Sequence, residues 1–177
     1  MRLRSAILVA LTATVAATTT YAAESPQVKR GKHLVDTHDC NACHTPFKMG
    51  PNGPEPDMSL MLSGHPEKLA MPPVPKLEAP WVWVAAGTNT AFGGPWGVSY
   101  AINLTSDAET GIGKWRESDF VQAIKTGKHL GVGRPIMPPM PWPAYRNLSD
   151  ADLKAMFAFL KTVPPIRNRA PDASPPK

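Results

Sequence analysis

Proline and glycine interrupt this chain so often that long regular elements have little room in it. Of its 177 residues, 21 are proline and 13 are glycine. Proline removes a backbone N–H donor and fixes φ, so it breaks helices and central strands. A continuous array of alternating strands and helices is therefore disfavoured. Because 42% of the residues are hydrophobic and only 19% are charged, the chain can still bury a core.

The first 23 residues are typical of a secretory signal peptide. Arg2 and Arg4 precede an uncharged stretch whose apolar part covers residues 6–17, and the small residues Ala22 and Ala23 follow. These are the three parts of an export signal, and the apolar part is shorter than the roughly 20 residues that span a bilayer. We expect cleavage near Ala22 or Ala23, with an uncleaved amphipathic tail as the alternative.

The charge of the remaining chain is mild. Removal of residues 1–23 takes away Arg2 and Arg4, which leaves 17 basic residues against 14 acidic ones and a net charge of +3. Long basic runs and clusters of arginine with aromatic residues are absent from the sequence, so nucleic-acid binding is not expected. The charge can still orient an encounter with an acidic partner.

Caps and apolar spacing predict three helices. The first begins at Ser25, which is followed by a proline at the first helical position, and it runs to about Asp39. Apolar residues at helical spacing predict a second helix over residues 117–126. Ser149 begins the third, with an acidic residue placed as in a capping box. Elsewhere we expect long loops rich in proline and glycine, and at most short strands within residues 81–86 and 96–104.

The motif that carries the chemistry is Cys40-Asn41-Ala42-Cys43-His44. This Cys-x-x-Cys-His spacing is the attachment sequence of a c-type haem. Residues three apart share one face of a helical turn, so the two thiols can add to the two vinyl groups on one edge of a porphyrin. The adjacent imidazole of His44 then lies over the iron as its proximal ligand.

Two other interpretations of the cysteine pair are weaker. A redox-active disulfide is expected within a thioredoxin-like pattern of strands and a helix, which does not surround this motif. A zinc site needs a second pair of Cys or His residues at suitable spacing, and the sequence offers none. The export signal and the lack of further cysteines favour one covalently bound haem c per chain.

Further motifs extend from the middle of the chain to its last helix. They are Asn103-Leu104-Thr105-Ser106-Asp107, Thr110-Gly111-Ile112-Gly113 with Trp115, Asp119-Phe120, Gly133-Arg134-Pro135-Ile136-Met137-Pro138-Pro139-Met140-Pro141-Trp142, and Leu148-Ser149-Asp150 with Asp152-Leu153. With the haem motif they resemble class I cytochromes c. The branch they are most similar to contains the c-type cytochrome domains associated with periplasmic alcohol, sugar-acid and aldehyde dehydrogenases of bacteria.

The resemblance implies the fold and the remaining iron ligand. We expect an all-α class I cytochrome c fold, with a signal peptide at 1–23, one haem domain at 24–165 and a flexible tail at 166–177. The position that matches the distal ligand of the branch is Met140, and Met137 is its rival. The resemblance also implies that the first and last helices cross at Gly31.

Smaller roles are expected for other residues around the haem. We expect a carbonyl of Pro51, Pro54 or Pro56 to accept the hydrogen bond of the His44 ring. Candidates to line the haem are Trp96, Tyr100, Trp115, Arg134 and Trp142. The remaining histidines, His33, His38, His65 and His129, are expected at the surface.

The function implied is electron transfer in the periplasm by a single haem, with His44 and a methionine filling both axial positions. The chain would then be an electron carrier or an electron-transfer subunit rather than an enzyme, and its partners would be a dehydrogenase, an oxidase or another cytochrome. One alternative is a five-coordinate haem peroxidase or gas-reactive haem protein that uses a residue such as His129. The sequence leaves open whether the chain is a free shuttle or a bound subunit.

Overall fold

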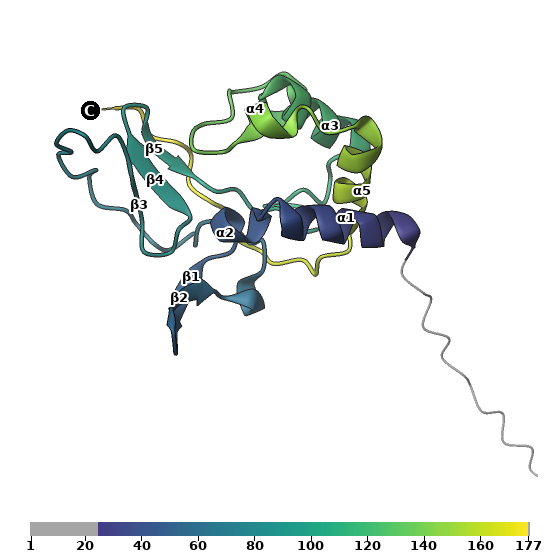
Figure 1. The fold of residues 1–177 in the computed structure, drawn as a ribbon, viewed down its shortest axis with the longest axis horizontal. Helices are drawn as coiled ribbons and strands as arrows, with labels where there is room; N and C mark the ends of the chain where they lie inside the picture. The colour runs from purple at the N-terminus through teal and green to yellow at the C-terminus, as the bar shows by residue number, and fades with distance from the viewer. Residues whose placement is uncertain (1–24, 177) are drawn as a thin grey trace, which may run out of the picture.

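The computed structural model describes residues 25–176, and the predicted signal peptide at residues 1–23 lies outside them. Within this part of the chain, five α-helices and five short strands alternate with long loops (Figure 1). The helices are α1 (Pro26–Thr37), α2 (Cys40–His44), α3 (Glu117–Thr126), α4 (Trp142–Tyr145) and α5 (Asp150–Leu160). The strands are β1 (Phe47–Gly50), β2 (Gly53–Pro56), β3 (Val84–Ala85), β4 (Ala91–Gly94) and β5 (Gly97–Tyr100), and single 3-10 turns occupy Met58–Leu60 and His129–Gly131.

The three predicted helices are present, and their ends follow from local chemistry. The Ser25 hydroxyl accepts a hydrogen bond from the Val28 N–H at 3.2 Å. The Ser149 hydroxyl accepts one from the Asp152 N–H at 3.1 Å. Such N-caps satisfy amide donors that have no partner inside the helix. At the end of α3, Gly127 has a φ of 67°, a conformation that glycine adopts without strain.

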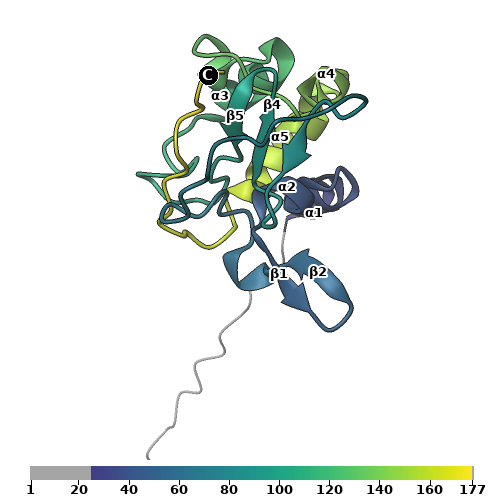
Figure 2. The same ribbon diagram turned by 90° about the vertical axis from the view of Figure 1, so that its left-hand side faces the viewer.

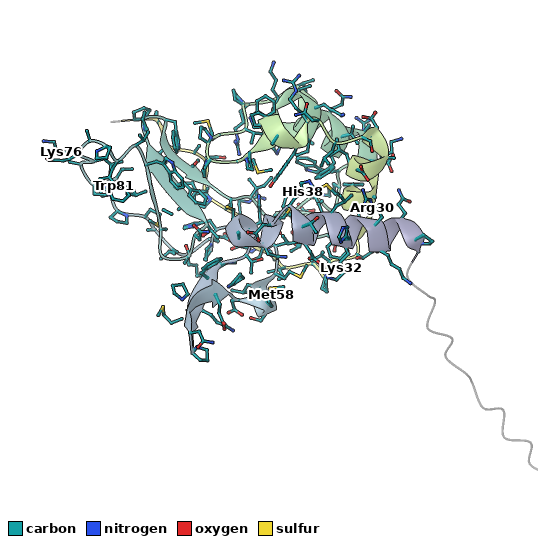
Figure 3. All side chains as sticks on the ribbon, in the orientation of Figure 1. Arg30, Lys32, His38, Met58, Lys76 and Trp81 are labelled. Atoms are coloured by element: carbon teal, nitrogen blue, oxygen red, sulfur yellow. The ribbon has the colours of Figure 1, made fainter. Side chains whose placement is uncertain are left out.

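Helices α1 and α5 cross at Gly31, as the resemblance implies. A Cβ built at Gly31 would overlap the carbonyl oxygen of Ala155 and lie 2.9 Å from the Cβ of Phe159. Only a residue without a side chain therefore permits this close approach. An ion pair between Arg30 and Asp152, with an N–O distance of 2.9 Å, joins the same two helices at the surface; Arg30 is labelled in Figure 3.

The hydrophobic core lies where α1, α3 and α5 meet. Its members are buried apolar side chains from these helices and from the loops that join them, and they include Leu34, Val35, Leu62, Ile112, Phe120, Ile124, Leu153, Met156, Phe157 and Leu160. The rings of Phe120 and Phe157 pack across α3 and α5 with centroids 5.6 Å apart. In residues 25–176 no helix is both long enough and apolar enough to span a membrane.

The prediction of an all-α fold is wrong. The structure is mixed, with 32% helix, 14% strand and two small antiparallel sheets. One sheet is the hairpin β1–β2, and the other has the order β3–β4–β5. Figure 2 shows the hairpin projecting from the body of the molecule, apart from the second sheet. Strands β3 and β5 lie inside the segments for which the sequence predicts short strands.

Of the missed strands β1, β2 and β4, the last two carry little sequence signal. Strand β2 reads Gly-Pro-Glu-Pro and β4 reads Ala-Phe-Gly-Gly. Proline and glycine are depleted in strands, and neither segment alternates between apolar and polar residues. Pairing with a neighbouring strand, such as Phe92 opposite Ser99, forms these elements despite their composition.

The C-terminal segment runs back along the domain. Asn103 donates to the Ile166 carbonyl at 2.7 Å, and Asn168 donates to the carbonyls of Ser63 and His65 at 2.7 and 2.8 Å. Further along, Ser174 forms an antiparallel bridge with Val98 of β5. The domain boundary at residue 165 and the flexibility of residues 166–177 remain predictions.

The prediction of a surface location is wrong for His65, which is fully buried. Its Nδ1 lies 2.9 Å from the Thr90 hydroxyl and its Nε2 lies 2.9 Å from the Leu69 carbonyl. A neutral ring that donates from Nε2 and accepts at Nδ1 satisfies both contacts. Burial lowers the pKa of His65 below its ordinary value, because the charged ring loses its hydration.

The buried His65 gives the stability of the domain a defined pH dependence. Because its folded pKa lies below its unfolded one, the unfolded chain binds more protons as the pH falls. We expect the free energy of unfolding to decrease from about pH 7 to about pH 5, by at most about 1.4 kcal/mol per pH unit for this group. The His65→Gln variant is expected to show a shallower decrease in urea titrations across this range.

The matched control for this prediction is His33→Gln, since His33 is exposed on α1. That variant is expected to keep the pH dependence of the wild type. An unchanged slope in His65→Gln would show that His65 is not the group responsible.

Candidate functional site

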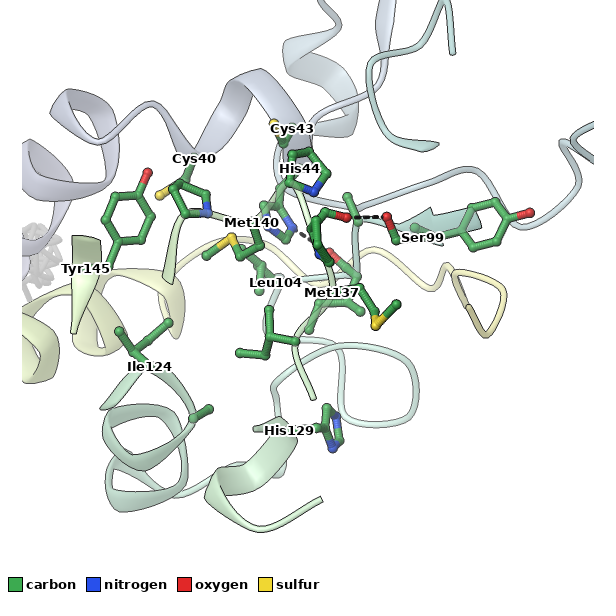
Figure 4. Close-up of a pocket in the computed structure, with 18 of the residues that line it drawn as sticks. Cys40, Cys43, His44, Ser99, Leu104, Ile124, His129, Met137, Met140 and Tyr145 are labelled. Carbon is green, nitrogen blue, oxygen red and sulfur yellow. Dashed lines mark hydrogen bonds between the residues drawn. The ribbon is translucent and has the colours of Figure 1, made fainter. Parts of the chain in front are cut away.

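A largely apolar cavity of about 340 Å³ lies between α2, α3, the sheet of β4 and β5, and the loop before α4 (Figure 4). Its walls bring together residues that are more than a hundred positions apart in the sequence. They include Cys40, Cys43, His44, Phe92, Ser99, Tyr100, Ile102, Leu104, Trp115, Phe120, Ile124, His129, Arg134, Met137, Met140, Tyr145 and Met156. A volume in this range is typical of cofactor sites.

The haem motif forms the single helical turn α2. Asp39 precedes it in a left-handed conformation with a φ of 53°, so the chain bends between α1 and α2. Thr45, the first residue after α2, fixes the C-terminal end of this turn. Its hydroxyl donates to the Asn41 side chain at 2.7 Å and accepts from the Leu62 N–H at 2.8 Å. The C-terminal end of the turn is thereby held against the domain.

Both cysteines of the motif line the cavity as free thiols. Burial raises the pKa of the Cys40 thiol to about 12, and the nearby Asp39 carboxylate adds to this shift. The same two causes raise the pKa of Cys43. Both side chains are therefore neutral near pH 7 in this structure, and they face an apolar space rather than a polar one.

The imidazole of His44 is fixed by one backbone hydrogen bond. Its Nδ1 donates to the carbonyl of Ile102 at 2.8 Å. Burial lowers the pKa of His44, so the ring is neutral. In this tautomer, Nε2 carries a lone pair that can bind a metal.

The prediction that a proline carbonyl accepts the His44 bond is wrong. Pro54 and Pro56 belong to β2 and Pro51 to the turn before it. None of the three lines the cavity, and in Figure 1 the hairpin extends from α2 in the direction opposite to α3 and α4. The acceptor Ile102 instead follows β5, 58 residues after His44 in the sequence. The second sheet therefore contributes directly to the position of the ring.

Both candidate methionines lie on the loop between the His129–Gly131 turn and α4. Met137 and Met140 are half-buried and both line the cavity, and in Figure 4 their side chains leave the loop in different directions. Met140 also packs against the hydrophobic core. The structure thus brings the five predicted site residues, Cys40, Cys43, His44, Met137 and Met140, around one cavity.

The other predicted lining residues divide into two groups. Tyr100, Trp115 and Arg134 line the cavity, whereas Trp96 and Trp142 do not. His129 lies at the same wall as Trp115, with ring centroids 5.1 Å apart. Burial lowers the pKa of His129, and the charge of Arg134 lowers it further.

Sequence reasoning missed Phe92, Ile102 and Tyr145 as parts of the site. Tyr145 donates from its hydroxyl to the His38 carbonyl at 2.7 Å, and burial raises its pKa to about 12. Its position after the Met-Pro segment is the one signal that points to it. Phe92 and Ile102 have none, because strand pairing alone brings them to the cavity.

The residues present fit a c-type haem. The cavity is apolar enough for a porphyrin, a neutral imidazole faces it, and it offers two thiols and two thioethers. Soft sulfur ligands and imidazole suit iron and similar metals. Among residues 25–176, no group of three or more His, Cys, Asp and Glu side chains gathers as a zinc site would require.

Comparison with known proteins gives consistent matches. The family model described as Cytochrome c matches residues 28–164. The cytochrome c subunit of alcohol dehydrogenase (quinone) from Gluconobacter oxydans is 32% identical over 157 residues, which are 87% of this chain and 26% of that protein. The gluconate 2-dehydrogenase cytochrome c subunit of Pantoea cypripedii is 31% identical over 150 residues, or 84% of this chain and 26% of that protein.

A third relative matches a shorter part of the chain. This protein, one of the subunits of nicotinate dehydrogenase from Pseudomonas putida, is 40% identical over 77 residues, which are 44% of this chain and 6% of that protein. The chain spans about a quarter of the length of the two cytochrome subunits that it matches more fully.

Proposed function

Because the chain belongs to the cytochrome c family, we propose that it transfers electrons through one haem c, bound covalently by Cys40 and Cys43 and ligated by His44 and Met140. The predicted resemblance to dehydrogenase-associated cytochromes is confirmed by relatives that are cytochrome c subunits of alcohol, gluconate and fructose dehydrogenases. These relatives also agree with a role as electron carrier rather than as the catalyst.

One observation supports the proposal above the others. The His44 ring is held by the Ile102 carbonyl with its Nε2 lone pair free, and it faces a cavity that Cys40, Cys43 and Met140 also line. These are the groups that would attach a haem covalently and ligate its iron. They come from separate segments that only this fold brings together.

When bound, the haem supplies a one-electron couple between ferric and ferrous iron. The chain determines how that couple behaves. Apolar side chains around the cavity exclude water, and a Met/His ligand pair raises the reduction potential. As the two protein ligands of the iron, His44 and Met140 would leave no coordination site for a substrate.

Met140 is the better candidate for the distal ligand. It packs against the hydrophobic core, and Pro139 and Pro141 on either side restrict its backbone,. A ligand held in place before binding loses less conformational entropy when it binds. Met137 is proposed as a packing residue at the cavity wall, a frequent use of a flexible thioether.

We place the protein in the periplasm, on the basis of the predicted signal peptide at residues 1–23. Its proposed electron donor is a dehydrogenase, since its relatives are subunits of such enzymes, and its acceptor is an oxidase or another cytochrome. A small, transient interface suits rapid electron exchange. If the partner surface is acidic, the mild positive charge makes the association weaken as salt increases.

The Met140→Ala variant tests the ligand assignment and the electron-transfer role together. In the oxidised wild type we expect a low-spin spectrum with the weak long-wavelength band of a methionine–iron bond. Met140→Ala is expected to lose this band because the thioether sulfur is gone. Its opened coordination site should also make it react with peroxide at least about tenfold faster than the wild type in stopped-flow mixing, if iron access limits that reaction.

The matched control is Met137→Ala, which removes the neighbouring thioether. It is expected to retain the band and to react slowly with peroxide, whereas loss of the band there and not in Met140→Ala would reassign the ligand. Fast reaction of the wild type with peroxide, combined with slow electron exchange with partner cytochromes, would move the protein to the peroxidase class.

A further inference from the structure

The loop that carries both methionines has few hydrogen-bond donors of its own. Residues 137–141 read Met-Pro-Pro-Met-Pro, so three of the five have no backbone N–H. The Met140 N–H donates to the Met137 carbonyl at 3.3 Å, within the loop itself. Before the loop, the Ile136 N–H donates to the Gly127 carbonyl at 2.8 Å. Attachment of the loop to the opposite wall of the cavity therefore depends on hydrogen-bond donors from elsewhere in the domain.

Ser99 of β5 supplies such a donor. Its side chain is buried, and its hydroxyl donates to the Pro138 carbonyl at 2.5 Å, a bond drawn as a dashed line in Figure 4. The Phe92 carbonyl also lies within reach of the Ser99 hydroxyl, at 3.4 Å. Since the hydroxyl has a single proton, the shorter contact to Pro138 is the stronger bond.

Trp96 orients the Ser99 hydroxyl through a second hydrogen bond to its oxygen. The indole Nε1–H donates to the Ser99 oxygen at 3.3 Å. A hydroxyl that accepts from one side directs its own proton to the other. Trp96, Ser99 and the Pro138 carbonyl thus form a directed chain from the β4–β5 turn to the methionine loop. This is the structural role of Trp96, which does not line the cavity itself.

Tyr145, at the end of α4, anchors the segment that follows the loop. The Tyr145 hydroxyl donates to the His38 carbonyl at the end of α1, at 2.7 Å. In Figure 4, Ser99 and Tyr145 lie on opposite sides of Met140. Met140 therefore lies between one attachment two residues before it, at Pro138, and another five residues after it.

We propose that Ser99 is a positioning residue that keeps Met140 directed at the haem iron and limits its replacement by external bases. The inference rests on the proposed ligation by Met140. Displacing this ligand requires the loop to move away from the cavity, which would break the Ser99–Pro138 bond. A hydrogen bond of this kind typically changes such an equilibrium by about fivefold, and more when its buried partners are left unpaired.

Imidazole binding to the oxidised holoprotein measures this restraint directly. When imidazole binds, a nitrogen–iron bond forms and the sulfur–iron bond of the methionine breaks, so the methionine–iron band disappears. Ser99→Ala is expected to bind imidazole about five- to tenfold more tightly than the wild type. Ser99→Thr keeps a hydroxyl and is expected to restore an affinity near that of the wild type. Equal affinity in the wild type and Ser99→Ala would overturn the proposal.

The matched control is Ser106→Ala. The Ser106 hydroxyl donates to the Val163 carbonyl at 2.6 Å, a bond of the same kind that lies outside the cavity lining. This variant is expected to lose stability without a change in imidazole affinity. An equal gain in affinity in both variants would mean general loosening of the domain and would also overturn the role of Ser99.

Two further outcomes keep the test decisive. A wild type without the methionine–iron band would contradict the proposed ligation itself, whereas a normal band with no effect of Ser99→Ala contradicts only the positioning role. If Ser99→Ala does not fold, Trp96→Phe removes the donor behind the hydroxyl. That variant is expected to bind imidazole about twofold more tightly, and no change there would overturn the proposal.

Discussion

Wild-type protein exported by cells with haem-attachment machinery is expected to carry the mass of one haem that survives acid–acetone extraction, and the Cys40→Ala/Cys43→Ala double variant is expected to carry none. The two thiols lie on one helical turn at the edge of the cavity, where each can form one thioether bond to the porphyrin. Mass spectrometry of the purified chains measures the difference. Each single variant is expected to attach haem less completely.

The matched control for attachment is His44→Ala, which keeps both cysteines. It is expected to retain covalent haem in the fraction that folds but to lose the normal six-coordinate spectrum, because the ligand oriented by Ile102 is missing. Extraction of the haem from the wild type by acid–acetone would contradict covalent attachment. Covalent haem in the double variant would mean that other residues hold it.

Gly31→Ala is expected to lower the free energy of unfolding by at least about 2 kcal/mol. The added Cβ would overlap the backbone oxygen of Ala155, so α1 and α5 would have to move apart, and overpacking of this kind costs about 3 kcal/mol. Alanine favours a helix over glycine by about 1 kcal/mol, which offsets only part of that cost. Urea unfolding followed by circular dichroism measures the net change.

The matched control is Gly87→Ala, because a Cβ built at Gly87 meets no atom within 4 Å. Its free energy of unfolding is expected to stay within about 0.5 kcal/mol of the wild type. A stability of Gly31→Ala equal to or above that of the wild type would show that the helix crossing adapts to a side chain. The close approach at Gly31 would then not be essential to the fold.

The parts of the fold that the sequence predicted depend on local chemistry. Helix α3 has the predicted bounds, and α5 begins after Ser149 as its capping pattern indicates. The cysteines and histidine of α2 fall on one helical turn, the geometry in which residues three or four apart share a face. In each case, residues within a few positions of one another contain the necessary information.

The parts that the sequence did not predict depend on distant contacts. Ile102 supplies the acceptor for His44 only because β5 is paired in a sheet whose partner strand contains two glycines. His65 is buried because the Leu69 carbonyl and the Thr90 hydroxyl satisfy both ring nitrogens. Neither contact leaves a periodic pattern, so neither could be inferred from residue types alone.

The bridge between Ser174 and Val98 has a consequence for self-association. Strand β5 is the last strand of its sheet, and an uncovered outer strand presents N–H and C=O groups on which another chain can build. Here the Val98 N–H donates to the Ser174 carbonyl at 3.0 Å, and the Ser174 N–H donates back at 2.9 Å. Glycine at position 97 permits this approach, since a Cβ there would overlap the Ser174 oxygen. The C-terminal segment therefore protects this edge against sheet extension between molecules, a common first step in aggregation.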